Sequence, residues 1–327
     1  MAGMTVTMET LHDARDAWEE LHALSAAPLF ASASWLEVLA EVFERDARVA
    51  MLSVDGAPRC GIPLLSRRRG NLRLVTALPI TLYAGRCARG VCTDEQLGAL
   101  LDRIEDDYHL LTLSDSFSEN ELRVFTSRGW DVREQRTLRV DLRDADALWK
   151  GYSQSLRRKL RKAAAAQLTL HSDPSTDSIL ALFEHSYRRH DLTPPFSMEN
   201  MRAWLELLRA RGMVECHAAV RPDGTTAAVR VIMRDGGMLY DWLAGADPAL
   251  CPFASHWLVH TLLTRGAAQG CATFDFMGAN TAGVSDFKRS FGSVEHVYHN
   301  LTWYRSVLMK YLLRVHEHRG RSKRVLS

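Results

Sequence analysis

The sequence predicts an α/β protein with mixed sheets, divided into two domains. Three observations carry this prediction. The chain has 327 residues, more than one hydrophobic core usually serves. Its 46% hydrophobic and 24% charged residues are typical of a globular protein with a large core. Segments of helical and strand periodicity alternate along it, and we place the two domains at residues 1–145 and 146–327.

The first domain begins with two helical patterns. Leu11, Trp18 and Leu21 recur at helical spacing, and Ser34 is a possible N-cap for a second helix that carries Trp35. Strands then alternate with further helices. The expected strands are 48–54, 61–65, 72–78, 110–113 and 136–142, and the further helices are 94–106 and 119–127.

The second domain has a clearer order of elements. An alanine-rich helix over 153–166 precedes a short strand at 168–171. Helices at 175–190 and 198–211 follow, and then three strands whose separators, Pro222-Asp223-Gly224 and Asp235-Gly236-Gly237, are strong hairpin signals. The remaining elements are strands at 214–221, 226–234, 238–246, 272–277 and 294–303, a long helix at 254–269 and a basic terminal helix.

Bulk properties exclude several classes of protein. A net charge of +2 does not by itself indicate a nucleic-acid partner. No stretch approaches the roughly 20 apolar residues of a membrane span, and acidic residues stand where a secretory signal needs basic ones. The six cysteines are scattered singly, without ligand spacing. We therefore expect a cytoplasmic protein with reduced thiols, no metal and no cofactor.

The most informative stretch is 286–294, which contains Phe287, Lys288 and Phe291. It follows a predicted strand end at Asp275 and glycines that permit tight turns. An ammonium group held in an apolar wall at the mouth of a sheet can stabilise a developing oxyanion. The alternative is a short surface helix whose phenylalanines belong to the core and whose lysine is solvated.

Four motifs in order extend this interpretation. They are Ser153–Lys162, Tyr240-Asp241-Trp242, Phe274–Gly278, and Phe287-Lys288 with Phe291-Gly292. With the order helix, helix, three-stranded meander, long helix, strand, helix, strand, the chain resembles the Fem-type branch of the GNAT acyltransferase superfamily. It is equally similar to the CelD-type acetyltransferases of that branch. The resemblance implies two tandem GNAT-like domains and an enzyme that transfers an acyl group to an amine.

The resemblance implies a role for Lys288, and the chemistry of amide formation suggests roles for two carboxylates. Lys288 matches the lysine taken to stabilise the transition state, and Phe287 would shape the acceptor pocket. Asp241 and Asp275 would accept the proton of the attacking amine or hold its ammonium form. Alternatives stay open: Asp275 as a turn cap near Gly278, Asp241 as a strand residue paired with an arginine such as Arg230, or proton loss assisted by the substrate.

Further candidates would bind the substrate. Arg189 matches a family arginine that contacts phosphate or carboxylate groups, which suits the bidentate guanidinium. Its alternative is a cation at a helix C-terminus, interacting with the dipole. The remaining candidates for the pocket are Asn280 and four aromatic residues, Tyr240, Trp242, Tyr83 and Trp35. The aromatic candidates are weaker, because aromatic residues are more often part of the core.

The acyl donor is inferred from the absence of a coenzyme A loop and from two groups of basic residues. Residues 247–255 contain no glycine and no basic residue, and Pro248 and Pro252 lack an N–H, so an ordinary coenzyme A loop is disfavoured. The basic run comprises Arg157, Arg158, Lys159, Arg161 and Lys162, and the basic tail comprises Arg314, Arg319, Arg321, Lys323 and Arg324. Both suggest tRNA phosphates as partners, with a solvated helix as the alternative.

The sequence thus predicts an N-acyltransferase that moves an aminoacyl group from aminoacyl-tRNA to a small-molecule or peptidyl amine. An acyl-CoA-dependent N-acetyltransferase is the first alternative. The second is a non-catalytic binding protein built on the same fold, in which replacement of Lys288 would change nothing.

Overall fold

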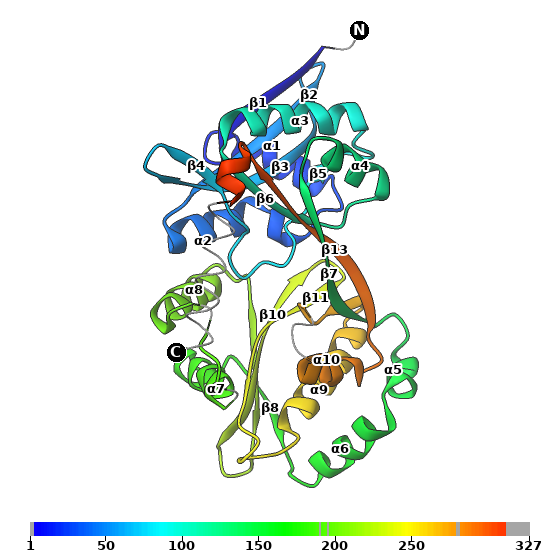
Figure 1. The fold of residues 1–327 in the computed structure, drawn as a ribbon. Helices are drawn as coiled ribbons and strands as arrows, with labels where there is room; N and C mark the ends of the chain where they lie inside the picture. Colours follow the sequence, from blue (N-terminus) through cyan, green and yellow to red (C-terminus); the bar gives the residue numbers. More distant parts are fainter. Residues whose placement is uncertain (1–2, 190, 195, 279–281, 312–327) are drawn as a thin grey trace. The chain divides into compact units, whose positions relative to one another are not determined.

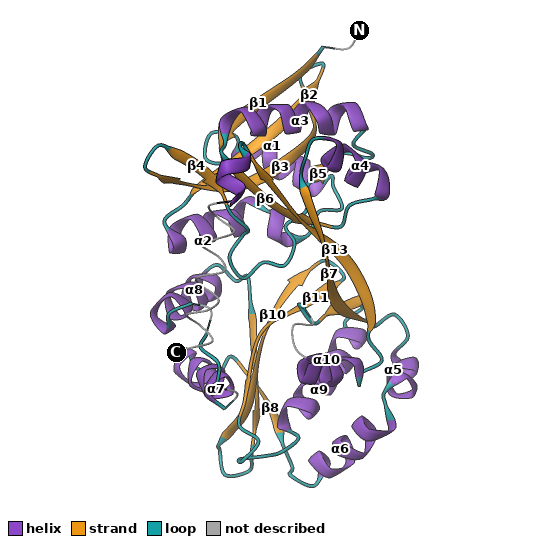
Figure 2. Cartoon of the chain, viewed as in Figure 1, coloured by secondary structure: helices purple, strands orange, loops and turns teal. Residues whose placement is uncertain are grey.

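The computed structural model describes residues 3–189, 191–194, 196–278 and 282–311. Helices and strands alternate along the chain, which confirms the mixed α/β class (Figures 1 and 2). The chain divides into two compact units: unit 1 is Met1–Gln135 with Val297–Ser327, and unit 2 is Arg136–His296. Residues from 297 onward thus belong to unit 1, whereas the division after residue 145 assigned them to the second domain. The two domains at residues 1–145 and 146–327 stay a prediction.

Unit 1 is built on a sheet with the order β1-β2-β3-β4-β6-β13. Neighbouring strands are antiparallel except β4 and β6, which pair in parallel. Its strands are β1 (Met4–Thr10), β2 (Asp46–Val54), β3 (Ala57–Arg69), β4 (Leu72–Val75), β5 (Cys87–Ala88, paired with β3), β6 (Leu110–Asp115) and β13 (Val294–Tyr304, which begins in unit 2). Its helices are α1 (Arg15–Ala23), the 3-10 turn η1 (Leu29–Ala31), α2 (Ala33–Phe43), α3 (Asp94–Asp107) and α4 (Glu119–Ser127).

Two details of unit 1 differ from the sequence prediction. The edge strand β1 was not predicted, because only the half-buried Val6 and Met8 pack on the core and its apolar signal is weak. The N-cap of α2 is Ser32 and not Ser34, since the Ser32 side chain accepts a hydrogen bond from the Trp35 backbone N–H at 3.2 Å.

Unit 2 has the sheet order β7-β12-β11-β10-β9-β8. The strands are β7 (Asp131–Asp141, which begins in unit 1), β8 (Thr169–Ser172), β9 (Glu215–Val220), β10 (Thr226–Asp235), β11 (Met238–Ala246) and β12 (Thr273–Asp275). Its helices are α5 (Ala145–Gly151), which was not predicted, α6 (Gln154–Ala164), α7 (Thr176–Arg188), α8 (Met198–Ala210), α9 (Ala254–Ala268) and α10 (Ala282–Arg289). The predicted meander is confirmed as β9, β10 and β11, joined by antiparallel pairing.

Helices cover both faces of the unit 2 sheet. Helix α7 packs on β10 and β11 from one side, and α9 packs on β9, β10 and β11 from the other (Figure 2). Gly245 allows the close approach of α7, because an added Cβ would lie 2.5 Å from backbone atoms of Leu182 and Phe183. The sheet is therefore buried on both sides, which explains the long apolar runs of its strands.

The candidate active site forms where the paired strands β11 and β12 separate. These two strands pair in parallel at only three positions, and the last pair is Tyr240 with Asp275. Beyond it, Asp241 continues along β11 while the chain leaves β12 at Phe276. Parallel strands that separate expose backbone groups between them, and polar side chains must satisfy those groups.

Several predictions fall outside the described residues. The basic tail from Arg314 to Arg324 and the substrate-binding candidate Asn280 are among them. Within the described part of the chain, no helix has both the length and the apolar character needed to cross a membrane.

Candidate active site

Lys288 lies on α10 and is buried, with 9% of its surface exposed. Its Nζ donates hydrogen bonds to the carbonyl oxygens of Phe276 at 2.7 Å and Gly278 at 2.6 Å. An ammonium group has three N–H donors, so one remains after these two bonds. The solvated surface lysine that the sequence left open is therefore not the arrangement found.

Burial lowers the pKa of Lys288 to about 8 from 10.5, because the charged form loses solvation. The carboxylate of Asp241 opposes this shift, and the guanidinium of Arg230 adds to it. At neutral pH most of the Lys288 side chain is still protonated. The site therefore holds a positive charge in an environment with little water.

The packing of α10 explains how this charge is held. The Phe291 ring is 1% exposed and lies 5.3 Å from the Phe287 ring and 5.7 Å from the Phe276 ring, measured between centroids. The chain turns at Gly292, where φ is 73° and an added Cβ would lie 2.8 Å from the Gly151 oxygen. Both contacts fix the helix end, and with it the direction of Lys288.

Asp275 is fully buried and fully bonded. Its Oδ1 accepts hydrogen bonds from the Thr137 hydroxyl at 2.6 Å and the Met277 N–H at 2.8 Å, and its Oδ2 accepts one from Arg139 Nε at 2.7 Å. Thr137 Oγ1 also accepts a bond from the Gly278 N–H at 2.9 Å. This is the turn-capping arrangement. Asp275 orders the loop whose carbonyls hold Lys288, and its oxygens already have partners.

Asp241 forms a buried ion pair with Arg230, the other alternative that the sequence left open. Both side chains are 5% exposed, and Arg230 Nη1 donates to Asp241 Oδ2. Arg230 also donates to Ser255 Oγ at 2.8 Å and lies over the Phe287 ring at 5.5 Å. Burial raises the pKa of Asp241, while Arg230 and Lys288 lower it.

The Arg230–Asp241 pair is not fully satisfied. Asp241 Oδ1 and Arg230 Nε are both buried and have no hydrogen-bond partner among the described residues. Buried polar atoms are seldom left in this state, and each exception calls for a water, an ion or a ligand. An acceptor and a donor thus remain available beside Lys288, whose charge acts on Asp241.

An open pocket of about 620 Å³ adjoins this cluster. Phe287 joins the two, since its ring lies in the pocket wall and under Arg230. The wall comes from α6, α9 and α10, through Ser153, Ser155, Lys159, His256, Gly283, Asp286, Phe287, Arg289 and Ser290. The pocket is large enough for a substrate group of moderate size.

His256 is the titratable ring in this wall. Its Nε2 lies 3.3 Å from Lys159 Nζ, and its ring meets Phe287 at 4.8 Å between centroids. Burial, Lys159 and Arg230 lower the pKa of His256 to about 4, so the imidazole is neutral at pH 7. No spacing signal in the sequence pointed to this histidine.

The other candidates in unit 2 lie differently. The Trp242 ring packs at 4.7 Å on the Trp204 ring and is 7% exposed. Tyr240 is 2% exposed, and burial raises its pKa. Arg189 is exposed and forms the C-cap of α7. This agrees with the alternative interpretation of Arg189 as a cation at a helix C-terminus. These side chains are held by the core or the helix end, and their substrate-binding roles stay predictions.

The two candidates from unit 1 belong to its aromatic core. The Trp35 ring is fully buried, donates to Thr81 Oγ1 at 3.1 Å and packs on Phe30 at 5.3 Å. Tyr83 is 4% exposed and lies 6.2 Å from the Phe30 ring. Neither is open to a ligand in this arrangement.

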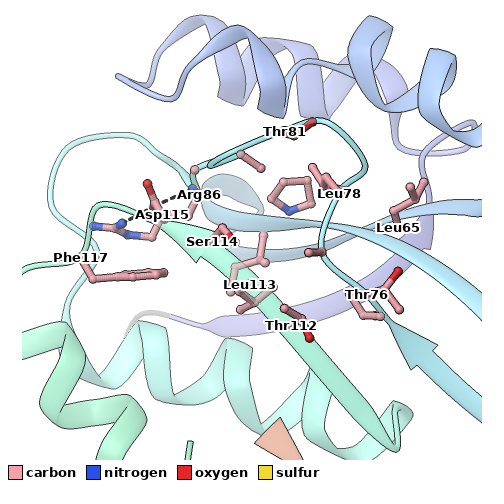
Figure 3. A pocket seen from close by; sticks show the side chains of 16 residues that line it. Leu65, Thr76, Leu78, Thr81, Arg86, Thr112, Leu113, Ser114, Asp115 and Phe117 are labelled. Atoms are coloured by element: carbon pink, nitrogen blue, oxygen red, sulfur yellow. Dashed lines mark hydrogen bonds and ion pairs between the residues drawn. The ribbon is translucent and has the colours of Figure 1, made fainter. Parts of the chain in front are cut away.

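Unit 1 also contains a small pocket, shown in Figure 3. It lies between Leu78, Thr112 and Phe117, and the ion pair between Arg86 Nη1 and Asp115 Oδ2, at 2.7 Å, stands at one end of it (Figure 3). Its volume of about 30 Å³ is far smaller than the 620 Å³ of the pocket beside Phe287.

The predicted tRNA-binding residues lie on α6. Leu156, Leu160 and Ala163 are buried, while Arg158, Arg161 and Lys162 are exposed. Arg157 bonds to the Trp149 and Lys150 carbonyls at 3.3 and 3.5 Å, and Lys159 lies beside His256. Within the described residues none of these five cations forms an ion pair, so the helix presents uncompensated positive charge.

Comparison with known proteins identifies the fold and a domain. Residues 150–289 match the family model described as acetyltransferase (GNAT) domain. Among solved structures, FemX superposes with a TM-score of 0.71 at 13% identity, covering 90% of this chain and 96% of its own. L-PGS from Bacillus licheniformis gives 0.57 at 13% identity, with coverages of 94% and 96%. A tandem GNAT protein from the clavulanic acid biosynthesis pathway gives 0.57 at 11% identity, with coverages of 93% and 99%.

No curated protein sequence shows significant similarity to the chain. The family match and the shared fold together support an acyltransferase, which uses an acyl donor and an amine acceptor. Residues 150–289 thus match a GNAT-type acetyltransferase domain, and the whole chain shares its fold with FemX and L-PGS.

Proposed function

We propose that this protein forms an amide by transferring an aminoacyl group from aminoacyl-tRNA to the amine of a small molecule or peptide. The observation that carries the proposal is the buried Lys288, fixed by two backbone carbonyls with one N–H left over. Such a donor is oriented before the reaction begins, which is the condition for strong stabilisation of a transition state.

In the first step the amine nitrogen attacks the ester carbonyl carbon, and the carbonyl oxygen becomes an oxyanion. The remaining N–H of Lys288 donates to that oxygen. One fixed donor of this kind lowers the barrier by about 3–4 kcal/mol. The intermediate then collapses: the new C–N bond stays, the C–O bond to the ribose breaks, and the oxyanion becomes the amide carbonyl.

One proton must leave the nitrogen and reach the departing ribose oxygen. Asp241 Oδ1 is a buried acceptor without a partner in the described chain, so it suits this proton or the ammonium group that carries it. Asp275 is less suited, because Thr137, Arg139 and the Met277 N–H occupy its oxygens. We assign Asp275 the role of positioning the loop that binds Lys288.

Two features support tRNA as the donor. The segment before α9 contains Pro248 and Pro252 and no glycine, so it offers few backbone N–H groups to a pyrophosphate. The exposed cations of α6, Arg158, Arg161 and Lys162, have no acidic partners in the described chain and suit phosphates.

Acyl-CoA is the second candidate donor, and two observations favour it. The matching family model describes an acetyltransferase domain. Helix α9 begins at Ala254 without a side-chain cap, which leaves N–H groups at its N-terminus for an anion.

The donor is tested by supplying each one alone with a panel of amines. The proposal expects amide product from charged tRNA, and loss of that product after RNase treatment. Turnover with acetyl-CoA in RNase-treated protein would overturn the tRNA donor but leave the amide-forming chemistry. Lys288→Met should lower either activity by a factor of about 10²–10³, the loss typical of one oxyanion donor, with Lys150→Met on α5 as the matched control. Unchanged turnover in Lys288→Met would overturn the role given to Lys288, whereas no turnover of the wild type with either donor would support the non-catalytic alternative.

A further inference from the structure

The hairpin of β3 and β4 in unit 1 carries a set of arginines that the proposed chemistry does not use. The segment from Arg67 to Arg73 reads Arg-Arg-Arg-Gly-Asn-Leu-Arg and contains no acidic residue. Its turn stands at the edge of unit 1, as the ribbon of β4 in Figure 1 shows. Arg45, just before β2, joins this set, which we call the arginine hairpin: Arg45, Arg67, Arg68, Arg69 and Arg73.

The hairpin brings like charges together in two places. Arg68 of β3 stands directly opposite Arg73 of β4. Asp46 stands opposite Ser66 at the end of the β2–β3 ladder, and Arg45 and Arg67 are the residues next to this last pair. Like charges directly opposite each other on neighbouring strands destabilise a sheet. The pKa of Arg45 is lowered by burial and by the Arg67 charge, which confirms their proximity.

The fold compensates little of this charge. Arg73 pairs with Asp107 at 3.4 Å, and its guanidinium lies over the Tyr108 ring at 5.1 Å. For the other four arginines the described residues provide no ion pair, and Arg67 Nε is buried without a hydrogen-bond partner. A surface with repeated repulsion, of whose five arginines only Arg73 has a carboxylate partner in the described chain, is complementary to an external polyanion.

We infer that the arginine hairpin binds the phosphate backbones of double-helical RNA, such as a tRNA stem. Side chains alternate along a strand, so Arg67 and Arg69 share one face while Arg68 and Arg73 share the other. A ribbon with cations on both faces can meet phosphates on both strands that border a groove. The guanidinium forks suit phosphate oxygens bidentately. A single small anion would leave most of these charges without a partner.

An anionic membrane is a poorer match. Binding in a lipid interface uses large apolar side chains beside the cations. Between Arg67 and Arg73 the only large apolar side chain is Leu72, which is 38% exposed. Membrane binding is therefore kept as an outcome of the test.

The test measures binding of labelled, deacylated tRNA to the full chain by fluorescence anisotropy, at salt concentrations from about 50 to 200 mM. The test variant replaces Arg45, Arg67, Arg68 and Arg69 by Gln. We expect at least a tenfold rise in Kd at low salt, and a fall of up to about 3.6 in the steepness of log affinity against log salt, since each of four lost contacts removes about 0.9.

A matched pair of variants controls for net charge. Arg67→Gln with Arg69→Gln should weaken binding, whereas Arg15→Gln with Arg123→Gln, which removes two exposed arginines that pair with Glu37 and Glu119, should not. Equal losses in both pairs would overturn the inference, as would wild-type affinity in the four-site variant. Binding to a DNA duplex but not tRNA, or sedimentation only with phosphatidylglycerol vesicles, would overturn it too.

The inference does not depend on the reaction proposed at Lys288. Because the RNA carries no aminoacyl group, Lys288→Met should bind it like the wild type while losing turnover. Loss of RNA binding and loss of amide formation are then separate results. Thermal unfolding of the four-site variant should be unchanged or slightly higher, because two repulsive pairs are removed.

Discussion

Each unit of this protein buries a cluster of charged side chains, and the two clusters differ in their balance. In unit 1, Arg86 bonds to both Asp115 and Glu121 and lies over the Phe117 ring at 5.1 Å, beside the small pocket of that unit. One cation there serves two carboxylates. In unit 2, Lys288, Arg230 and Arg139 face Asp241 and Asp275.

The difference indicates which cluster is suited to catalysis. The unit 2 cluster has one more cation than carboxylates, and Lys288 and Asp241 retain a free donor and a free acceptor. A reaction that develops a negative charge is favoured where positive charge exceeds negative in a dry site. Arg86 Nε is also buried without a partner among the described residues, but its cluster has the opposite charge balance and a pocket of only about 30 Å³, so we regard it as structural.

The largest effect should come from removing the arginine of either cluster. Arg230→Met leaves Asp241 buried without its partner, and Arg86→Met leaves Asp115 facing Glu121. Breaking a buried pair in this way costs about 3–5 kcal/mol of unfolding free energy. Urea unfolding measures it. If the comparison holds, Arg230→Met with Asp241→Leu recovers most of the stability, since no lone charge remains, but it stays inactive.

The next effect separates the clusters by function. Lys288→Met should lower kcat by a factor of about 10²–10³, the loss typical of one oxyanion donor. Single-turnover rates with the donor identified above would show this, and circular dichroism would show that the fold is kept. An Arg86→Met variant assayed below its unfolding transition should retain kcat. Equal losses of kcat in both variants would contradict the assignment of chemistry to unit 2.

The pH dependence sharpens the comparison further. The pKa of Lys288 is lowered to about 8, and catalysis requires its charged form, so activity should fall as pH rises above about 8. Stability should change in the opposite direction. Between pH 8 and 10.5 the unfolded chain binds the Lys288 proton more tightly than the folded one, so unfolding free energy rises with pH by up to about 3 kcal/mol.

This stability effect is read as a difference between the wild type and Lys288→Met. Two buried tyrosines act with the opposite sign above about pH 10: burial raises the pKa of Tyr152 and Tyr240, so their contribution to the unfolding free energy falls as pH increases. Subtracting the unfolding free energy of Lys288→Met from that of the wild type removes the tyrosine contributions, which both proteins share. A difference that does not change with pH above 8 would show that Lys288 is not perturbed.

The sequence predicted the local parts of this arrangement and missed the long-range ones. Turn residues located the meander, and the phenylalanines around Lys288 indicated a buried ammonium. The partners of Asp275 were not predictable, because Arg139 lies 136 positions away on a strand whose neighbour no local pattern reveals. Arg230 was foreseeable only as a possible partner of Asp241, from an arginine within an apolar strand.

The smallest expected effect concerns Arg189, for which two interpretations predict different measurements. As the C-cap of α7 it interacts with the helix dipole, and Arg189→Gln would then cost about 0.3–1 kcal/mol of stability and leave kinetics unchanged. As an anion-binding residue it would instead raise KM for a phosphate- or carboxylate-bearing acceptor without changing kcat. Arg188→Gln, one residue earlier and also exposed, is the matched control. A rise in KM for Arg189→Gln alone would extend the site beyond the buried cluster, and its absence would confine substrate recognition to the pocket beside Phe287.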